Sequence, residues 1–287
     1  MATIYVNSKW GNGIPVYIKD GTVYNYERTG DGVTTSTSYN TLAAAARLIE
    51  LENATREPNL DSGLAVFELH GKIELRGLSF AYHPGRPVLS GLDLVLEPGA
   101  KLLVSGPSGS GKSTLFALLL GFYKPLAGAI LVDDRPVDAY NVRALRRKIG
   151  YLGPFPEFIP SSLRANLTLG CPDPPDDDAI FAALDAAGAG SVVRVLPRGL
   201  DTVLTESVRN FSAGERLRFA LARELLRGCS LLLLDEATAH LDPENETLFL
   251  ETVLRVFRSR TVLMIRHTPH PLTDSFPLLC LGDKREN

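Results

Sequence analysis

Two short stretches near the start of the chain alternate apolar and polar residues, the pattern of β-strands with one covered face. They run from Ile14 to Ile18 and from Thr22 to Tyr26, and Lys19–Asp20–Gly21 separates them. This arrangement predicts a small β-hairpin. Residues 1–41 contain no leucine, so a boundary near residue 40 is favoured. This β-rich segment is either an unrelated leader or fused segment, or a native partner-binding module, and a segment of about 40 residues rarely sustains a core alone.

From Leu42 onward the pattern becomes helical. Apolar residues recur three and four positions apart between Leu42 and Ile49, which predicts a helix from Thr41 to Asn53. Glu57–Pro58–Asn59 stops this helix. We therefore expect residues 42–70 to form a helix followed by a linker.

Beyond Gly71, strand and helix patterns alternate. The predicted strands are Lys72–Leu75, Lys101–Ser105, Leu231–Leu234 and Thr261–Ile265. The last three are short apolar runs, which suit strands covered by helices on both faces. Helical spacing dominates between Ser161 and Arg227. The sequence thus predicts an α/β domain at residues 71–287, with a mostly parallel sheet and an inserted helical subdomain at about residues 161–228.

Composition and charge exclude several classes of protein. The 287 residues are 45% hydrophobic and 22% charged, which is typical of globular chains rather than disordered ones. The net charge of -3 provides no positive field for a nucleic acid, so we expect no nucleic-acid partner. Cys171, Cys229 and Cys280 are odd in number and far apart, which predicts neither disulfides nor a zinc site and fits a reducing cytosol. We also expect no signal peptide and no membrane span, because the first residues lack the order of a signal peptide and no run of 18 apolar residues occurs.

A phosphate-binding loop follows the predicted strand Lys101–Ser105. Residues 106–114 match the pattern GxxxxGK[ST] and lead into an apolar run with helical spacing. In this setting, backbone N–H groups and the helix N-terminus surround a phosphate, Lys112 reaches the β- and γ-phosphates, and Ser113 offers its hydroxyl to Mg²⁺. The alternative, a glycine-rich turn with no ligand, explains the lysine and serine less well. The expected nucleotide-binding residues are Gly106, Pro107, Ser108, Gly109, Ser110, Gly111, Lys112, Ser113 and Thr114.

A pair of carboxylates ends the apolar strand Leu231–Leu234. α/β sheets bind ligands at this edge, and neighbouring strand residues point to opposite faces. Asp235 is therefore expected to hold Mg²⁺, and Glu236 is expected to orient or deprotonate the attacking water. In isolation, such an acidic pair is more often a solvated strand end.

Phe211–Ser212–Ala213–Gly214–Glu215–Arg216 resembles the LSGGQ signature of ATP-binding cassette (ABC) proteins. With the two motifs above, residues 42–283 resemble the nucleotide-binding domain of an ABC protein, more closely the exporter type. Ser212 can cap a helix from about Ala213 to Leu226, so that hydroxyl, N–H groups and helix dipole converge on an anion. In this family the anion is the γ-phosphate held by the opposite subunit, which implies roles for Ser212, Gly214 and Glu215 across a dimer interface.

The resemblance implies further positions. Tyr82 would stack on adenine, Asp242 would lie in a loop at the dimer interface, and His267 would hydrogen-bond the γ-phosphate as the family's switch histidine. Glu206 stands where exporters have an acidic residue that contacts the membrane domains. The implied fold is a P-loop NTPase core with an antiparallel β-subdomain, and the Leu42 helix would continue from an exporter's last membrane helix.

Three residues depart from the family pattern. Pro154 stands where a glutamine normally contacts Mg²⁺ and water, and a proline has no side-chain amide. Ala213 and Glu215 replace the usual Gly and Gln, and Glu215 adds a negative charge where triphosphate would dock. Since Lys112 and Glu236 are present, we expect a competent ATPase with slow turnover.

The implied function is ATP binding and hydrolysis, with ATP and Mg²⁺ as cofactors, driving transport at the cytoplasmic face of a membrane. The implied partners are a second nucleotide-binding domain, in a homodimer or heterodimer, and the transmembrane domains of an exporter. One alternative is a catalytically impaired, regulatory ATP-binding subunit of a heteromeric complex. Another, a soluble cassette ATPase of DNA repair or translation, is disfavoured by the acidic charge and by Glu206.

Overall fold

The computed structural model describes the backbone of strands within residues 3–6, 14–19, 22–29 and 32–36, and the structure of residues 62–65, 68–204 and 211–282. The predicted helix at residues 41–53 and Glu206 lie outside the described residues. The chain divides into two compact units, Met1–Glu57 and Pro58–Asn287. The boundaries predicted near residues 41 and 70 stay predictions.

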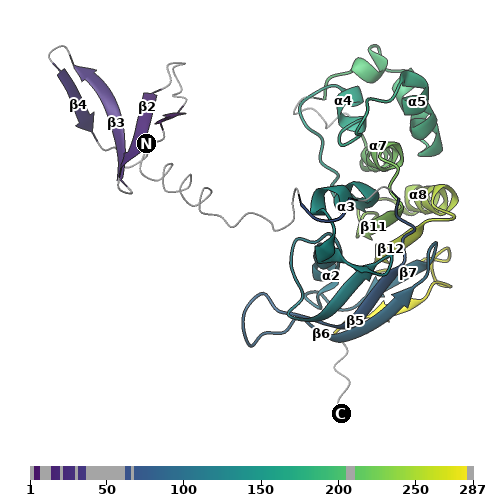
Figure 1. The fold of residues 1–287 in the computed structure, drawn as a ribbon. Helices are drawn as coiled ribbons and strands as arrows, with labels where there is room; N and C mark the ends of the chain where they lie inside the picture. Colours follow the sequence, from purple (N-terminus) through teal and green to yellow (C-terminus); the bar gives the residue numbers. More distant parts are fainter. Residues whose placement is uncertain are drawn as a thin grey trace. The chain divides into compact units, whose positions relative to one another are not determined.

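The first unit contains an antiparallel sheet of four described strands (Figure 1). The strands, in spatial order, are β1 (Thr3–Val6), β2 (Ile14–Lys19), β3 (Thr22–Thr29) and β4 (Gly32–Ser36). The predicted hairpin is confirmed as β2 and β3, which pair from Val16 with Asn25 to Lys19 with Thr22. The sequence analysis did not identify the outer strands β1 and β4.

The second unit is built on a parallel sheet whose middle strands are covered on both faces. Its spatial order is β10 (Ile149–Leu152), β11 (Leu231–Asp235), β12 (Thr261–Ile265), β7 (Lys101–Ser105) and β13 (Leu278–Cys280). Every residue of β11 and β12 is buried. The prediction from the apolar runs is confirmed, and β10 and β13 are additions to it.

Alternate residues of β11 feed two different hydrophobic cores. Leu231 and Leu233 pack with α2 (Lys112–Leu119) and with an antiparallel sheet. Leu232 and Leu234 pack with the helices of the other layer, including α7 (Ala213–Leu226) and α8 (Pro243–Val256). Because successive strand side chains point to opposite faces, a strand covered on both sides reads as a continuous apolar run.

The antiparallel sheet implied by the family resemblance is present. Its spatial order is β6 (Leu89–Leu96), β5 (Ile73–Phe80), β8 (Ala127–Val132) and β9 (Arg135–Pro136). β5 continues past its predicted end at Leu75, because Gly77 allows a bulge with φ 54° and pairing resumes at Leu78. The β8–β9 turn also holds the start of β5, since the Asp133 carboxylate accepts the N–H groups of His70, Gly71 and Lys72.

The inserted helical subdomain lies at the opposite end of this unit from β5 and β6 (Figure 1). Its helices are α4 (Leu163–Leu167), α5 (Asp177–Ala186), α6 (Gly190–Arg194) and α7, the last with the predicted bounds. A further helix, α3 (Val142–Lys148), precedes β10. Among the described residues, none of the helices combines the length and apolar character that crossing a bilayer requires. The parallel sheet with helices packed against it confirms the predicted α/β fold class.

Candidate functional site

The loop between β7 and α2 encloses the side chain of Lys112. The Lys112 side chain is almost buried, and Nζ donates to Gly106 O at 2.9 Å and Pro107 O at 3.0 Å. Gly106 has φ 150°, and a Cβ there would lie 2.3 Å from Leu281 O, so the tight loop requires glycine. The buried Ser110 Oγ has no hydrogen-bond partner among the described residues. A buried unpaired hydroxyl and a lysine bonded only to its own loop fit a site for phosphate oxygens.

Ser113 and Asp235 meet at the carboxyl edge of the parallel sheet. Ser113 is the second residue of α2, Asp235 ends β11, and Ser113 Oγ donates to Asp235 Oδ1 at 3.3 Å. Burial raises the pKa of Asp235, although hydrogen bonds from Ser113 and Tyr151 act in the opposite direction. Within the described residues, no group of three His, Cys, Asp or Glu side chains could hold a metal. A hydroxyl and one carboxylate fit Mg²⁺, which takes few protein oxygens and completes its shell with phosphate and water.

Glu236 and His267 form the second pair at this edge. They follow the neighbouring strands β11 and β12, and His267 Nε2 lies 2.6 Å from Glu236 Oε1. Glu236 N donates to Ile265 O, and the residue has φ 52°, a left-handed conformation that costs a non-glycine residue about 1–2 kcal/mol. Both side chains remain partly exposed. The arrangement can hold a carboxylate and an imidazole where a water molecule can reach both.

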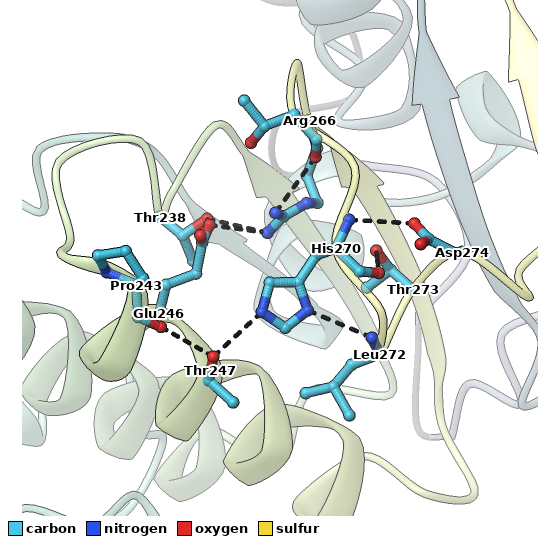
Figure 2. A network of polar contacts seen from close by, with 10 residues as sticks. Thr238, Pro243, Glu246, Thr247, Arg266, His270, Leu272, Thr273 and Asp274 are labelled. Carbon is cyan, nitrogen blue, oxygen red and sulfur yellow. Dashed lines mark hydrogen bonds and ion pairs between the residues drawn. The ribbon is translucent and has the colours of Figure 1, made fainter.

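A polar network centred on Arg266 joins the segments that follow β11 and β12 (Figure 2). Arg266 follows β12, its side chain is only 8% exposed, and Nη1 donates to Glu246 Oε1 at 3.0 Å and Thr238 Oγ1 at 3.2 Å. Thr238 Oγ1 in turn donates to Glu246 Oε1 at 2.6 Å. A cavity of about 300 Å³ adjoins both this network and the Glu236–His267 pair. The network therefore ties the segment after β11 to the segment after β12.

Tyr82 lies beside the phosphate-binding loop with an exposed ring. Its hydroxyl is 3.0 Å from Thr114 Oγ1, and the residue is 48% exposed. The ring makes edge contacts with Phe80 and Tyr123, at centroid distances of 4.9 and 5.3 Å. Tyr123, which the sequence analysis did not single out, is a second exposed aromatic residue here. The pair offers an aromatic surface next to the loop, suited to a nucleobase.

Ser212 is exposed at the N-terminus of α7. Its Oγ accepts the N–H of Glu215 at 3.1 Å, and its own N–H donates to Glu215 Oε2 at 2.7 Å. The two residues thus form a capping box, and the cap expected at Ser212 is confirmed. Gly214 is buried, and a Cβ there would approach the Arg218 guanidinium to 3.2 Å. Ser212 itself is exposed to solvent.

Asp242 caps α8. Its Oδ1 accepts the N–H of Asn245 at 3.0 Å, and Oδ2 accepts from the Asn245 amide at 2.7 Å. These hydrogen bonds lower the pKa of Asp242. Asp242 is therefore the N-cap of α8, the helix that follows the loop after Glu236.

Comparison with known proteins decides the family. The sequence model described as ABC transporter matches residues 89–239, which is more than half of the chain. The chain belongs to the ABC transporter family. The multidrug resistance ABC transporter ATP-binding and permease protein of Lactococcus lactis is 35% identical over 247 residues, covering 84% of this chain and 42% of that protein. The mycobactin import ATP-binding/permease protein IrtA of Mycolicibacterium thermoresistibile is 39% identical over 215 residues, covering 75% of this chain and 24% of that protein.

The solved structures agree with the sequence relatives. A bacterial Atm1-family ABC exporter with ATP bound superposes with a TM-score of 0.73 and 29% identity, covering 85% of this chain and 44% of that one. The chain therefore has the fold of an ABC exporter nucleotide-binding domain. It spans less than half the length of each of these relatives.

Within this ABC domain, the structure brings together some of the sequence-predicted residues. Ser113 meets Asp235, and Glu236 meets His267. Ser212 and Glu215 of the signature hydrogen-bond each other instead, which is compatible with the role across a dimer that the resemblance implies. Glu236 and His267 were each expected near the γ-phosphate, and their contact with each other is new information.

β10 and the loop after it make contacts that the sequence did not reveal. Pro154 supplies no amide, but Tyr151 Oη donates to Asp235 Oδ2 at 3.1 Å. Phe155 stacks on His240 with centroids 4.4 Å apart and an interplanar angle of 24°. His240 is exposed even though it carries this stacking contact. Spacing along the chain gave no signal for either contact, because more than 80 residues separate the partners.

Proposed function

We propose that this chain binds ATP and hydrolyses it as the nucleotide-binding domain of an ABC exporter, and that a pair of such domains drives transport. The observation that carries the proposal is the meeting of Ser113 with Asp235 and of Glu236 with His267 at one sheet edge, beside a loop with an unpaired buried hydroxyl. Family membership supports ATP binding in general. The roles of the individual residues are part of the proposal.

The chain's own residues bind and orient the nucleotide. Tyr82 stacks on the base, Lys112 exchanges its bonds to Gly106 and Pro107 for bonds to phosphate oxygens, and Ser113 with Asp235 holds Mg²⁺. When bound, Mg²⁺ neutralises negative charge on the β- and γ-phosphates. The remaining loop positions contribute backbone N–H groups.

Glu236 accepts the proton of the attacking water, and His267 holds Glu236 in place until it turns to the γ-phosphate. The 2.6 Å contact between Nε2 and Oε1 supports this exchange, because one imidazole nitrogen can bond either group but not both at once. Hydrolysis then depends on the release of this contact. We expect turnover to be slow, since Pro154 provides no amide to orient the water.

The second half of each site comes from a partner domain. Ser212 is exposed with α7 behind it, so its hydroxyl and the helix N-terminus can face a γ-phosphate held by another subunit. Asp242 lies in the loop that would approach the same interface. Glu215 is already bonded to Ser212 N, which reduces the repulsion expected from its charge.

Transmembrane domains of an exporter complete the proposed assembly, with this domain at the cytoplasmic face. The relatives named above are ATP-binding and permease proteins, and this chain spans less than half of each. The transported substrate and the choice between homodimer and heterodimer are not part of the proposal.

The test is Glu236→Gln, which keeps the size of the side chain and removes its charge. Loss of a general base lowers rates by about 10²–10⁴, so steady-state phosphate release should fall at least a hundredfold while ATP binding persists. Light scattering should show an ATP-dependent dimer. Glu244→Gln, at an exposed position in the first turn of α8, is the matched control and should retain activity. A variant that stays monomeric at every ATP concentration would contradict the proposal.

A second candidate function is favoured by Pro154. Without the amide, the chain can be a regulatory subunit that binds ATP as a structural link in a heteromer and does not turn it over. Phosphate release from the unaltered chain decides between the two. Binding without detectable release, also after addition of a related partner domain, favours the regulatory subunit.

A further inference from the structure

Tyr151 contacts the carboxylate that is expected to hold the metal. It lies in β10, which pairs with β11 so that Tyr151 is opposite Leu233 and Leu152 opposite Leu234. Asp235 is the next residue of β11, and the Tyr151 hydroxyl reaches it to donate to Oδ2 at 3.1 Å. The other carboxylate oxygen, Oδ1, lies beside Ser113 at 3.3 Å. The two oxygens of Asp235 are thus held by two different partners.

The residues that follow Tyr151 are suited to this position of its ring. Gly153 lies beside the ring, and a Cβ there would be at ordinary van der Waals distances, 3.4 Å from Tyr151 Cε1 and 3.5 Å from Tyr151 Oη. Pro154, which follows, has no donor group in its side chain. Among the described residues of β10 and the loop after it, Tyr151 is the one that hydrogen-bonds Asp235.

The Tyr151 side chain is a phenol, an O–H donor whose ordinary pKa lies well above neutral pH. A protonated hydroxyl donates to a carboxylate but presents no negative charge to a cation. Tyr151 therefore holds Oδ2 without adding a charge that would attract or repel the metal ion. Oδ1 remains beside the Ser113 hydroxyl.

We propose that Tyr151 is a positioning residue for the metal ion: its hydroxyl fixes Oδ2 of Asp235 so that Oδ1 and the Ser113 hydroxyl face the cation together. Tyr151 thereby supplies from the end of β10 the contact with the metal site that Pro154 cannot make. The inference rests on the proposed function, because it assumes that a metal–nucleotide complex binds here.

The experiment measures how strongly a metal tightens nucleotide binding. The dissociation constant of a fluorescent, non-hydrolysable ATP analogue is determined with EDTA and with Mn²⁺, which accepts the same oxygen ligands as Mg²⁺. The ratio of the two constants is the coupling between metal and nucleotide. This readout needs no catalysis, so slow turnover does not affect it.

Tyr151→Phe should reduce this ratio about fivefold, the effect of losing one hydrogen bond to a charged group that water can partly replace. The constant measured with EDTA should not change. Tyr140→Phe is the matched control: it removes a hydroxyl that donates to Val132 O at 2.7 Å, and should leave the ratio unchanged.

Each outcome separates the inference from the proposed function. If the unaltered chain binds no nucleotide, the proposed function fails. If the unaltered chain binds nucleotide and Tyr151→Phe leaves the ratio unchanged or increases it, Tyr151 does not position Asp235 and the inference is overturned. A wild-type ratio of one would also overturn it, since no metal would then be held at Asp235.

Discussion

Replacing Arg266 by alanine tests its network with Glu246 and Thr238 (Figure 2). The change removes a guanidinium that is only 8% exposed and leaves the Glu246 carboxylate without its cation. Breaking a buried ion pair by removing one partner costs about 3–5 kcal/mol. Glu246 keeps 18% of its side chain exposed and retains the bond from Thr238, so we expect a smaller loss of about 2–3 kcal/mol in the free energy of unfolding.

Urea denaturation followed by circular dichroism measures this loss, with an unchanged m-value as the sign that the unfolding transition itself is the same. Arg258→Ala, at an exposed position after α8, is the control and should stay within about 0.5 kcal/mol of the unaltered chain. In the double variant Arg266→Ala with Glu246→Gln, the loss should be smaller than in Arg266→Ala alone, because no charge is left unpaired. A loss below about 0.5 kcal/mol for Arg266→Ala would refute the reasoning.

Two further predictions concern Asp235 and the N-terminus of α7. Because burial raises the pKa of Asp235 in the folded state, the folded chain binds this proton more tightly than the unfolded chain, and stability falls as the pH rises through the raised pKa. Asp235→Asn should therefore raise the thermal midpoint of the nucleotide-free chain at pH 7, and the gain should shrink near pH 4; an equal gain at both pH values would contradict this. Ser212→Ala removes the cap of α7 and should cost about 1 kcal/mol in urea denaturation, whereas Ser212→Asn should cost less; equal losses would argue against a capping role.

The sequence predicted the fold best where burial is complete. The strand Thr261–Ile265, which is buried throughout, has the predicted bounds, because a strand covered on both faces is an uninterrupted apolar run. Lys101–Ser105 also has the predicted bounds, although only Leu102 and Val104 in it are buried. β10 was not predicted as a strand, since its four residues include Gly150 and an exposed Tyr151. β13 is shorter still, and its three residues pair with β7.

The sequence predicted those residues of the candidate site that belong to motifs at the ends of strands. Ser113 and Asp235 were expected at one edge, and the structure brings them together. The contacts of Arg266 with Glu246 and Thr238 were not predictable, because they depend on how two segments 20 or more residues apart pack in space. The signal in the sequence was a charged residue, Arg266, directly after the five residues of an apolar strand. That signal does not show which residue Arg266 contacts.

The leucine run of β11 has a consequence for how the acidic end is placed. Four identical side chains satisfy both cores equally well, so their hydrophobicity cannot distinguish one alignment from an alignment shifted by a residue. Contacts directly before the run help to fix the alignment instead: Ser230 N donates to Lys148 O, and Arg260 Nη1 donates to Cys229 O. One additional leucine would keep the interior filled and yet turn Asp235 away from Ser113. In this strand, the number of leucines matters to the chemistry more than their identity does.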